Sequence, residues 1–104
     1  MSQFDVYQNP NPTSKKKFPY LIDVQADLLN HLSTRVVIPF MLSSKIKHPI
    51  KHLMPHFSIE ETSVTLITSE ITSVSTRILN KKIASLRYKR NEIIAAIDFL
   101  FTGI

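Results

Sequence analysis

The sequence contains no cysteine and only one glycine among its 104 residues. Without cysteine the chain has no disulfide framework, no thiolate zinc site and no cysteine nucleophile. With Gly103 as its single glycine, it cannot form a glycine-rich phosphate loop or a Gly-x-Ser-x-Gly nucleophile elbow. Because no set of residues assembles a recognisable active site, the sequence favours a binding protein without catalytic residues, metal or cofactor over an enzyme.

Long apolar runs are also absent. No segment offers about 18 uninterrupted apolar residues, and MSQFDVYQNPNPTSKKK lacks the charged region followed by an apolar run of a signal peptide. We therefore expect a cytoplasmic protein with no membrane partner. A chain of this length fits one domain spanning residues 1–104.

The formal net charge is +5, and the cations fall in three groups at 15–17, 45–51 and 81–90. These groups are spread along the chain and interrupted by apolar residues. That distribution favours a solvated basic surface over a dedicated nucleic-acid face. An acidic protein segment would suit the same charges.

Apolar and polar residues alternate, or β-branched residues gather, in several short segments. Such patterns predict strands, here at 3–8, 19–29, 34–41, 54–60, 63–70 and 71–79. Pro39 is expected to mark a bulge or an end of its strand. Because the chain has a single glycine, we expect its hairpins to use loops longer than tight glycine turns.

The pattern changes to a helical period near the C-terminus. Apolar residues recur on one helical face, at Ile93, Ile94, Ile97, Leu100, Phe101 and Ile104. The spacing predicts a helix that begins between Ser85 and Asn91. We expect Ile93, Ile97 and Leu100 to pack against the sheet, whereas the apolar end of the helix is either packed away or exposed for a partner.

Three histidines and two glutamates are candidate metal-ligating or catalytic residues. His48, His52 and His56 are spaced by four, but intervening prolines interrupt any helix that would align them as metal ligands. Glu60 and Glu61 are adjacent, so they are expected in a solvated turn and not as a catalytic carboxylate pair. The histidines therefore do not predict a metal site, and the glutamates do not predict a catalytic site.

A set of short segments runs in order from Phe4 to Ile104: FDVY, YLIDVQADLL, TRVVIPF, LMP, LITSEITSV and AIDFLFTGI. Through these segments the chain resembles the CcdB toxins of plasmid and chromosomal toxin–antitoxin modules. The resemblance implies a mainly β fold with one C-terminal α-helix, an SH3-like barrel of the CcdB and MazF type. It comprises an antiparallel sheet of about five strands plus a small accessory sheet. A homodimer is also implied.

The resemblance implies a gyrase inhibitor that performs no chemistry of its own. Such a toxin binds the DNA gyrase A subunit and traps the topoisomerase with its DNA cleaved. The CcdA antitoxin neutralises the toxin through an acidic, disordered C-terminal segment, and the complexes repress transcription of their own operon. No direct binding of nucleic acid is expected without the antitoxin. The basic surface fits such a flexible acidic partner.

The same resemblance implies which residues bind gyrase: Leu28, Leu29, Asp98, Phe101, Thr102, Gly103 and Ile104. Two of these depart from the family pattern, because Thr102 stands where the family has tryptophan and Asp98 where the F-plasmid type has asparagine. Either Phe101 and Ile104 anchor the contact in this chain, or the chain is a weakened or inactivated toxin.

Two other functions remain open at this point. A MazF-like endoribonuclease would share the fold and would need groups such as Arg35 and Thr68 to polarise a phosphate and move a proton. A basic DNA-binding module is the other alternative, although no helix-turn-helix pair stands out.

Overall fold

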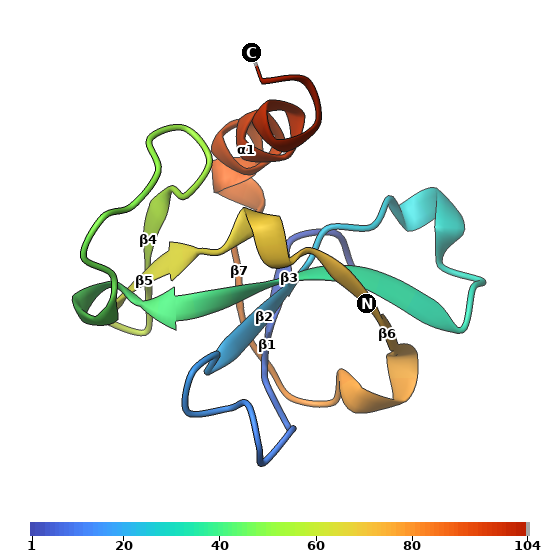
Figure 1. Ribbon diagram of the computed structural model, residues 1–104. Helices are drawn as coiled ribbons and strands as arrows, with labels where there is room; N and C mark the ends of the chain where they lie inside the picture. Colours follow the sequence, from blue (N-terminus) through green and yellow to red (C-terminus); the bar gives the residue numbers. More distant parts are fainter. Residues whose placement is uncertain (104) are drawn as a thin grey trace.

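The protein is a curled antiparallel sheet with a C-terminal helix packed across it (Figure 1). The computed structural model describes residues 1–103. Its strands are β1 (Asp5–Gln8), β2 (Tyr20–Asp23), β3 (Thr34–Leu42), β4 (His56–Ile59), β5 (Thr62–Leu66), β6 (Thr72–Ser75) and β7 (Lys82–Ser85), and its helix is α1 (Arg90–Thr102). Short 3₁₀ turns connect them: η1 (Asp27–Leu29), η2 (Ser43–Lys45), η3 (Thr68–Glu70), η4 (Thr76–Ile78) and η5 (Arg87–Lys89).

The long strand β3 organises the sheet. The strand order is β4-β5-β3-β2-β1-β7, and β6 also pairs with β3. Along its second edge β3 pairs first with β6, at 34–37, and then with β5, at 40–42. One edge of β3 therefore pairs with two different strands in succession. The β4–β5 hairpin and β6 diverge from each other where the partner changes, and the sheet is curled as a result.

Pro39 lies at the change of partner. It is opposite Leu21 of β2, inside β3, so the expectation of a bulge or strand end is wrong. Proline lacks a backbone N–H and disrupts a strand only where that donor is needed. Here the second edge has no ladder partner at Pro39, and its carbonyl still accepts the N–H of Ile67 at 2.9 Å.

The main core lies between the concave face of the sheet and α1. Ile93 and Ala96 of the helix are fully buried there, and Ile97 packs against the same cluster. A smaller cluster on the opposite face contains Tyr7, Leu21, Val37 and Leu79. Because the segment after β6 covers that face, β1 is buried on both sides and not on one side as its alternation predicts.

The predicted strands are all present, although their bounds differ. The segment 19–29 ends as a strand at Asp23 and turns into η1, and the segment 63–70 turns into η3. Strand β7 was not predicted, because its four residues show no marked β pattern. The helix begins at Arg90, inside the expected range. The expected mainly β fold with one C-terminal helix is confirmed.

The hairpin between β4 and β5 contradicts the expectation of long loops. Ile59 pairs with Thr62, so only Glu60 and Glu61 form the turn, with φ values of +49° and +66°. Two positive φ values are typical of a type I′ turn, whose twist matches the flanking strands. For residues with a Cβ this conformation is unfavourable by about 1–2 kcal/mol each. Both glutamates therefore lie in a turn, as predicted, but the turn is tight and strained.

We expect Glu61→Gly to raise the free energy of unfolding by about 1 kcal/mol, because glycine adopts the left-handed conformation without the Cβ clash. Chemical denaturation of the variant and the parent protein measures the change. Glu61→Ala is the control, since it removes the carboxylate and keeps the Cβ. An equal gain in Glu61→Ala would show that charge repulsion, and not backbone strain, is relieved.

Candidate functional site

The C-terminal end of α1 is ordered and partly exposed. Gly103 ends the helix in the left-handed conformation, with φ +72°, and its N–H donates to the carbonyl of Phe99 at 2.9 Å. The hydroxyl of Thr102 donates to the carbonyl of Asp98 at 2.7 Å. Phe101 is 72% exposed, and Asp98 is exposed as well. The helix thus presents a large apolar side chain to solvent from a fixed backbone; Ile104 lies outside the described residues.

The leucine pair projects from η1. Leu28 is 88% exposed and Leu29 is 40% exposed. The turn is held from both sides, since the Gln3 N–H donates to the Asp27 carboxylate at 2.8 Å and the Gln25 amide donates to the Leu29 carbonyl at 3.2 Å. Leu28 is therefore an exposed apolar residue on a fixed support, like Phe101.

A buried ion pair supports the η1 segment. The Arg35 guanidinium contacts the Asp23 carboxylate, with Nε–Oδ2 at 2.8 Å and Nη2–Oδ2 at 2.6 Å, and the two side chains are 1% and 0% exposed. The same guanidinium donates to the side chain of Asn30 and to the carbonyl of Gln25. Burial raises the pKa of the Asp23 carboxyl, and the hydrogen bond from Arg35 opposes that rise. One cation thereby ties β2, β3 and both ends of the η1 segment together.

These contacts also bear on the endoribonuclease alternative. The Arg35 guanidinium is buried and already bound to a carboxylate, so it does not face solvent where an RNA phosphate could reach it. Thr68 is fully buried as well, and its hydroxyl donates to the Leu53 carbonyl at 2.5 Å. The two residues considered for phosphate chemistry are thus engaged in internal bonds.

The predicted site residues form two separate patches in one chain. Asp27 of η1 lines a small cleft together with Arg87 and Arg90, so η1 lies beside the beginning of α1. The helix rises about 1.5 Å per residue, which places Thr102 about 18 Å along the axis from Arg90. Figure 1 likewise shows η1, in cyan, away from the C-terminal end of the helix. A single chain therefore does not bring the leucine pair and the helix end together.

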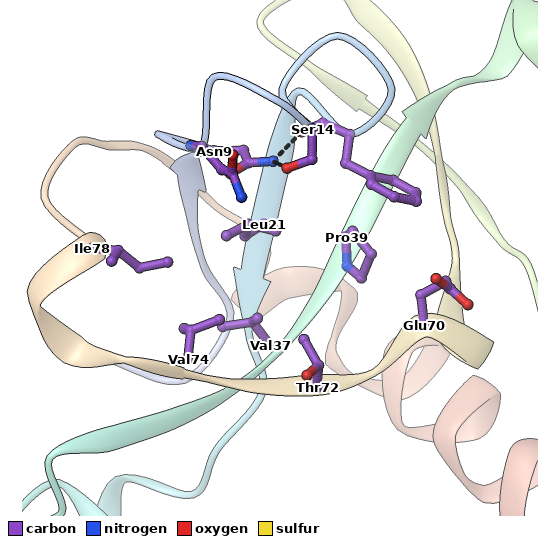
Figure 2. A pocket seen from close by; sticks show the side chains of 11 residues that line it. Asn9, Ser14, Leu21, Val37, Pro39, Glu70, Thr72, Val74 and Ile78 are labelled. Carbon is purple, nitrogen blue, oxygen red and sulfur yellow. Dashed lines mark hydrogen bonds between the residues drawn. The ribbon is translucent and has the colours of Figure 1, made fainter.

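A groove of about 370 Å³ lies on the face of the sheet opposite α1 (Figure 2). Leu21, Val37 and Pro39 line it together with side chains from β6 and from the loop after β1. That loop is fixed by Asn9, whose amide donates to the Ser14 hydroxyl at 3.0 Å and to the Phe18 carbonyl at 2.9 Å. The groove can receive an apolar side chain, but it contains none of the predicted site residues.

The three histidines do not converge. His56 lies on β4, with its Nδ1 2.6 Å from the Thr65 hydroxyl, and the ring centroids of His52 and Phe99 are 6.0 Å apart. Within residues 1–103, no three histidine or acidic side chains are grouped so that they could hold a metal ion. Over the same range, no helix has the length and apolar character needed to cross a membrane.

We expect Arg35→Ala to lower the free energy of unfolding by about 3–5 kcal/mol, because it leaves the Asp23 carboxylate buried without its partner. Thermal and chemical denaturation provide the measurement. Lys89→Ala is the matched control: its ion pair with Glu92, at 3.3 Å, is on the surface and contributes about 0–1 kcal/mol. Equal effects of the two substitutions would contradict the structural role of the buried pair.

Comparison with protein families gives a match over nearly the whole chain. The sequence model of the family described as CcdB protein matches residues 3–103. The match includes every strand and the helix, as well as η1 and the described part of the helix end.

Proposed function

The chain belongs to the CcdB family of toxins from toxin–antitoxin modules, and on that premise we propose that it binds the A subunit of DNA gyrase and traps the enzyme with its DNA cleaved. The observation that carries this proposal is the exposed Phe101 on a helix end whose backbone is fixed by its cap. The toxin acts by binding and carries out no chemical step. Its target is the dimerisation region of the A subunit.

The physical support is the placement of large apolar side chains on rigid elements. A solvent-exposed phenylalanine or leucine is unremarkable singly, but apolar anchors that need no ordering on binding are typical of energetically important interface residues. Phe101 and Leu28 meet this description, since both are exposed and supported by hydrogen-bonded backbone. The proposed gyrase-binding set is Leu28, Leu29, Asp98, Phe101, Thr102, Gly103 and Ile104.

A homodimer is part of the proposal. One chain presents the leucine pair and the helix end as two patches. Two copies related by a twofold axis near their helix ends would join two Phe101 side chains into one larger apolar surface, flanked by the two leucine pairs. This arrangement would give a symmetric contact with the dimeric region of gyrase.

Thr102 makes this chain a weakened toxin in our proposal. A threonine cannot stack on a partner's arginine as a tryptophan can, and truncation of a central interface tryptophan typically costs on the order of 2–4 kcal/mol. The Thr102 hydroxyl donates within the helix, to the Asp98 carbonyl. The remaining anchor on the described end of the helix is Phe101.

The charge of the chain, as well as its family, supports an acidic antitoxin as a partner. The chain has a formal net charge of +5 and no acidic residue between Asp27 and Glu60. A disordered acidic segment would meet a long-range attraction on approach and would fold on contact. We propose that such a segment, from a CcdA antitoxin, neutralises this toxin.

We expect Thr102→Trp to tighten binding to the gyrase A dimerisation fragment by at least tenfold, because the indole adds an aromatic anchor next to Phe101. We expect Phe101→Ala to weaken binding by a similar factor. Isothermal titration calorimetry at one salt concentration provides both affinities.

Tyr88→Ala is the control for exposed aromatic area, because Tyr88 is 74% exposed at the other end of the helix region. Binding that responds equally to Tyr88→Ala and Phe101→Ala would remove the helix end from its proposed role. No binding by any variant, including Thr102→Trp, would refute the gyrase proposal itself.

A further inference from the structure

A cleft of about 280 Å³ lies between η1 and the beginning of α1, and Gln3, Phe4, Asp27, Arg87 and Arg90 line it. Gln3 and Asp27 hold the η1 turn through their hydrogen bond, whereas Phe4, Arg87 and Arg90 have no part in the contacts described for the proposed gyrase surface. We propose that this cleft binds carboxylate side chains of the antitoxin's acidic segment. The inference rests on the proposed function, since it assigns that partner a place on this chain.

The two arginines are available for a ligand. Within residues 1–103, neither guanidinium forms an ion pair, whereas the neighbouring Lys89 is paired with Glu92 at 3.3 Å. The carboxylate in the cleft, Asp27, accepts the N–H of Gln3 at 2.8 Å and lies 4.0 Å from the buried Arg35 guanidinium. Its charge is thus partly compensated from the other side, and the cleft retains a net positive charge. Planar guanidinium groups suit bidentate carboxylate contacts.

The wall of the cleft is rigid. Phe4 is 1% exposed and adopts a left-handed conformation, with φ +72°. Its N–H donates to the Asp23 carbonyl at 2.6 Å, and its carbonyl accepts the Leu86 N–H at 2.8 Å. Phe4 therefore links Leu86, the residue before Arg87, to Asp23 of β2, which is one partner of the buried ion pair. A fixed backbone limits the ordering needed when a ligand binds.

The charges oppose the preference of the helix itself. Arg90 is the first residue of α1, Arg87 lies one turn before it, and the side chain of the N-cap residue Lys89 forms no capping hydrogen bond. The helix dipole disfavours cations at this end. The arginines therefore do not stabilise the helix, and a bound carboxylate would relieve their mutual repulsion.

The flanks of the cleft indicate a peptide. Leu28 follows Asp27 and is 88% exposed, and Tyr88 follows Arg87 and is 74% exposed. A ligand that fits this surface carries carboxylates next to apolar side chains, as an amphipathic acidic segment does. A nucleic-acid backbone would bring phosphates towards the Asp27 carboxylate without using the apolar flanks. An acidic segment bound in this cleft would cover the leucine pair and so block its proposed contact with gyrase.

The test uses the full chain and a labelled peptide of the acidic C-terminal segment of a CcdA antitoxin, with fluorescence anisotropy as the readout. The double variant Arg87→Glu/Arg90→Glu should bind the peptide at least tenfold more weakly than the parent. The control Lys16→Glu/Arg77→Glu changes net charge equally at exposed residues outside the cleft. It should lose much less affinity.

Thermal unfolding of the cleft variant tests whether a folding defect, and not the loss of the arginines, causes a loss of peptide affinity. Glutamates at the start of α1 agree with the helix dipole, so the cleft variant should keep or raise the parent's Tm. The inference is overturned if the two double variants lose the same affinity, or if the cleft variant binds the peptide as the parent does. It is also overturned if the cleft variant loses only a salt-dependent affinity for duplex DNA.

Gyrase binding measured on the parent chain separates this inference from the proposed function. Peptide binding that depends on the cleft arginines, in a chain that does not bind the gyrase fragment, would uphold the inference and refute the gyrase target. If the chain binds the gyrase fragment and the arginine substitutions do not change its affinity for the peptide, the gyrase target is upheld and the inference about the cleft is refuted.

Discussion

The contact between Arg35 and Asp23 is the interaction on which the placement of η1, and with it the proposed gyrase-binding leucine pair, depends. A guanidinium and a carboxylate this deeply buried are compatible with folding only when each is paired and hydrogen-bonded. The remaining donors of Arg35 reach Asn30 and the Gln25 carbonyl, so the pair also fixes the segment that carries η1. The exposed Leu28 is thereby held on a rigid support instead of collapsing onto the core.

Helix α1 packs one face against the core and leaves side chains exposed at its C-terminal end. Ile93 and Ala96 fix one face of the helix against the sheet, and this fixes by geometry which side chains face outward at its end. Phe101 lies on the exposed side, and Gly103 stops the helix two residues later in a conformation that other residues adopt with strain. Arg90 begins the opposite end of the helix and Arg87 lies in η5 just before it, and both line the cleft beside η1.

Local patterns in the sequence predicted local structure well. Alternation and β-branched clusters located every strand except β7, and the helical period located α1 but left open whether Phe101 is packed or exposed. The tight turn at Glu60 and Glu61 was missed because only tertiary pairing of β4 with β5 forces residues with a Cβ to positive φ. The burial of Arg35 was missed for a related reason, since its partner Asp23 lies on another strand. The distance between the leucine pair and the helix end likewise depends on the path of the chain through the fold, which the local spacing of apolar residues does not predict.

Deleting residues 102–104 tests the central claim, that the end of α1 is the toxin's gyrase contact, most directly. The deletion removes the helix cap but none of the buried residues of α1. The account predicts loss of binding to the gyrase A dimerisation fragment, together with a folded protein that still binds the antitoxin peptide. Unchanged gyrase affinity in the truncated chain would contradict it.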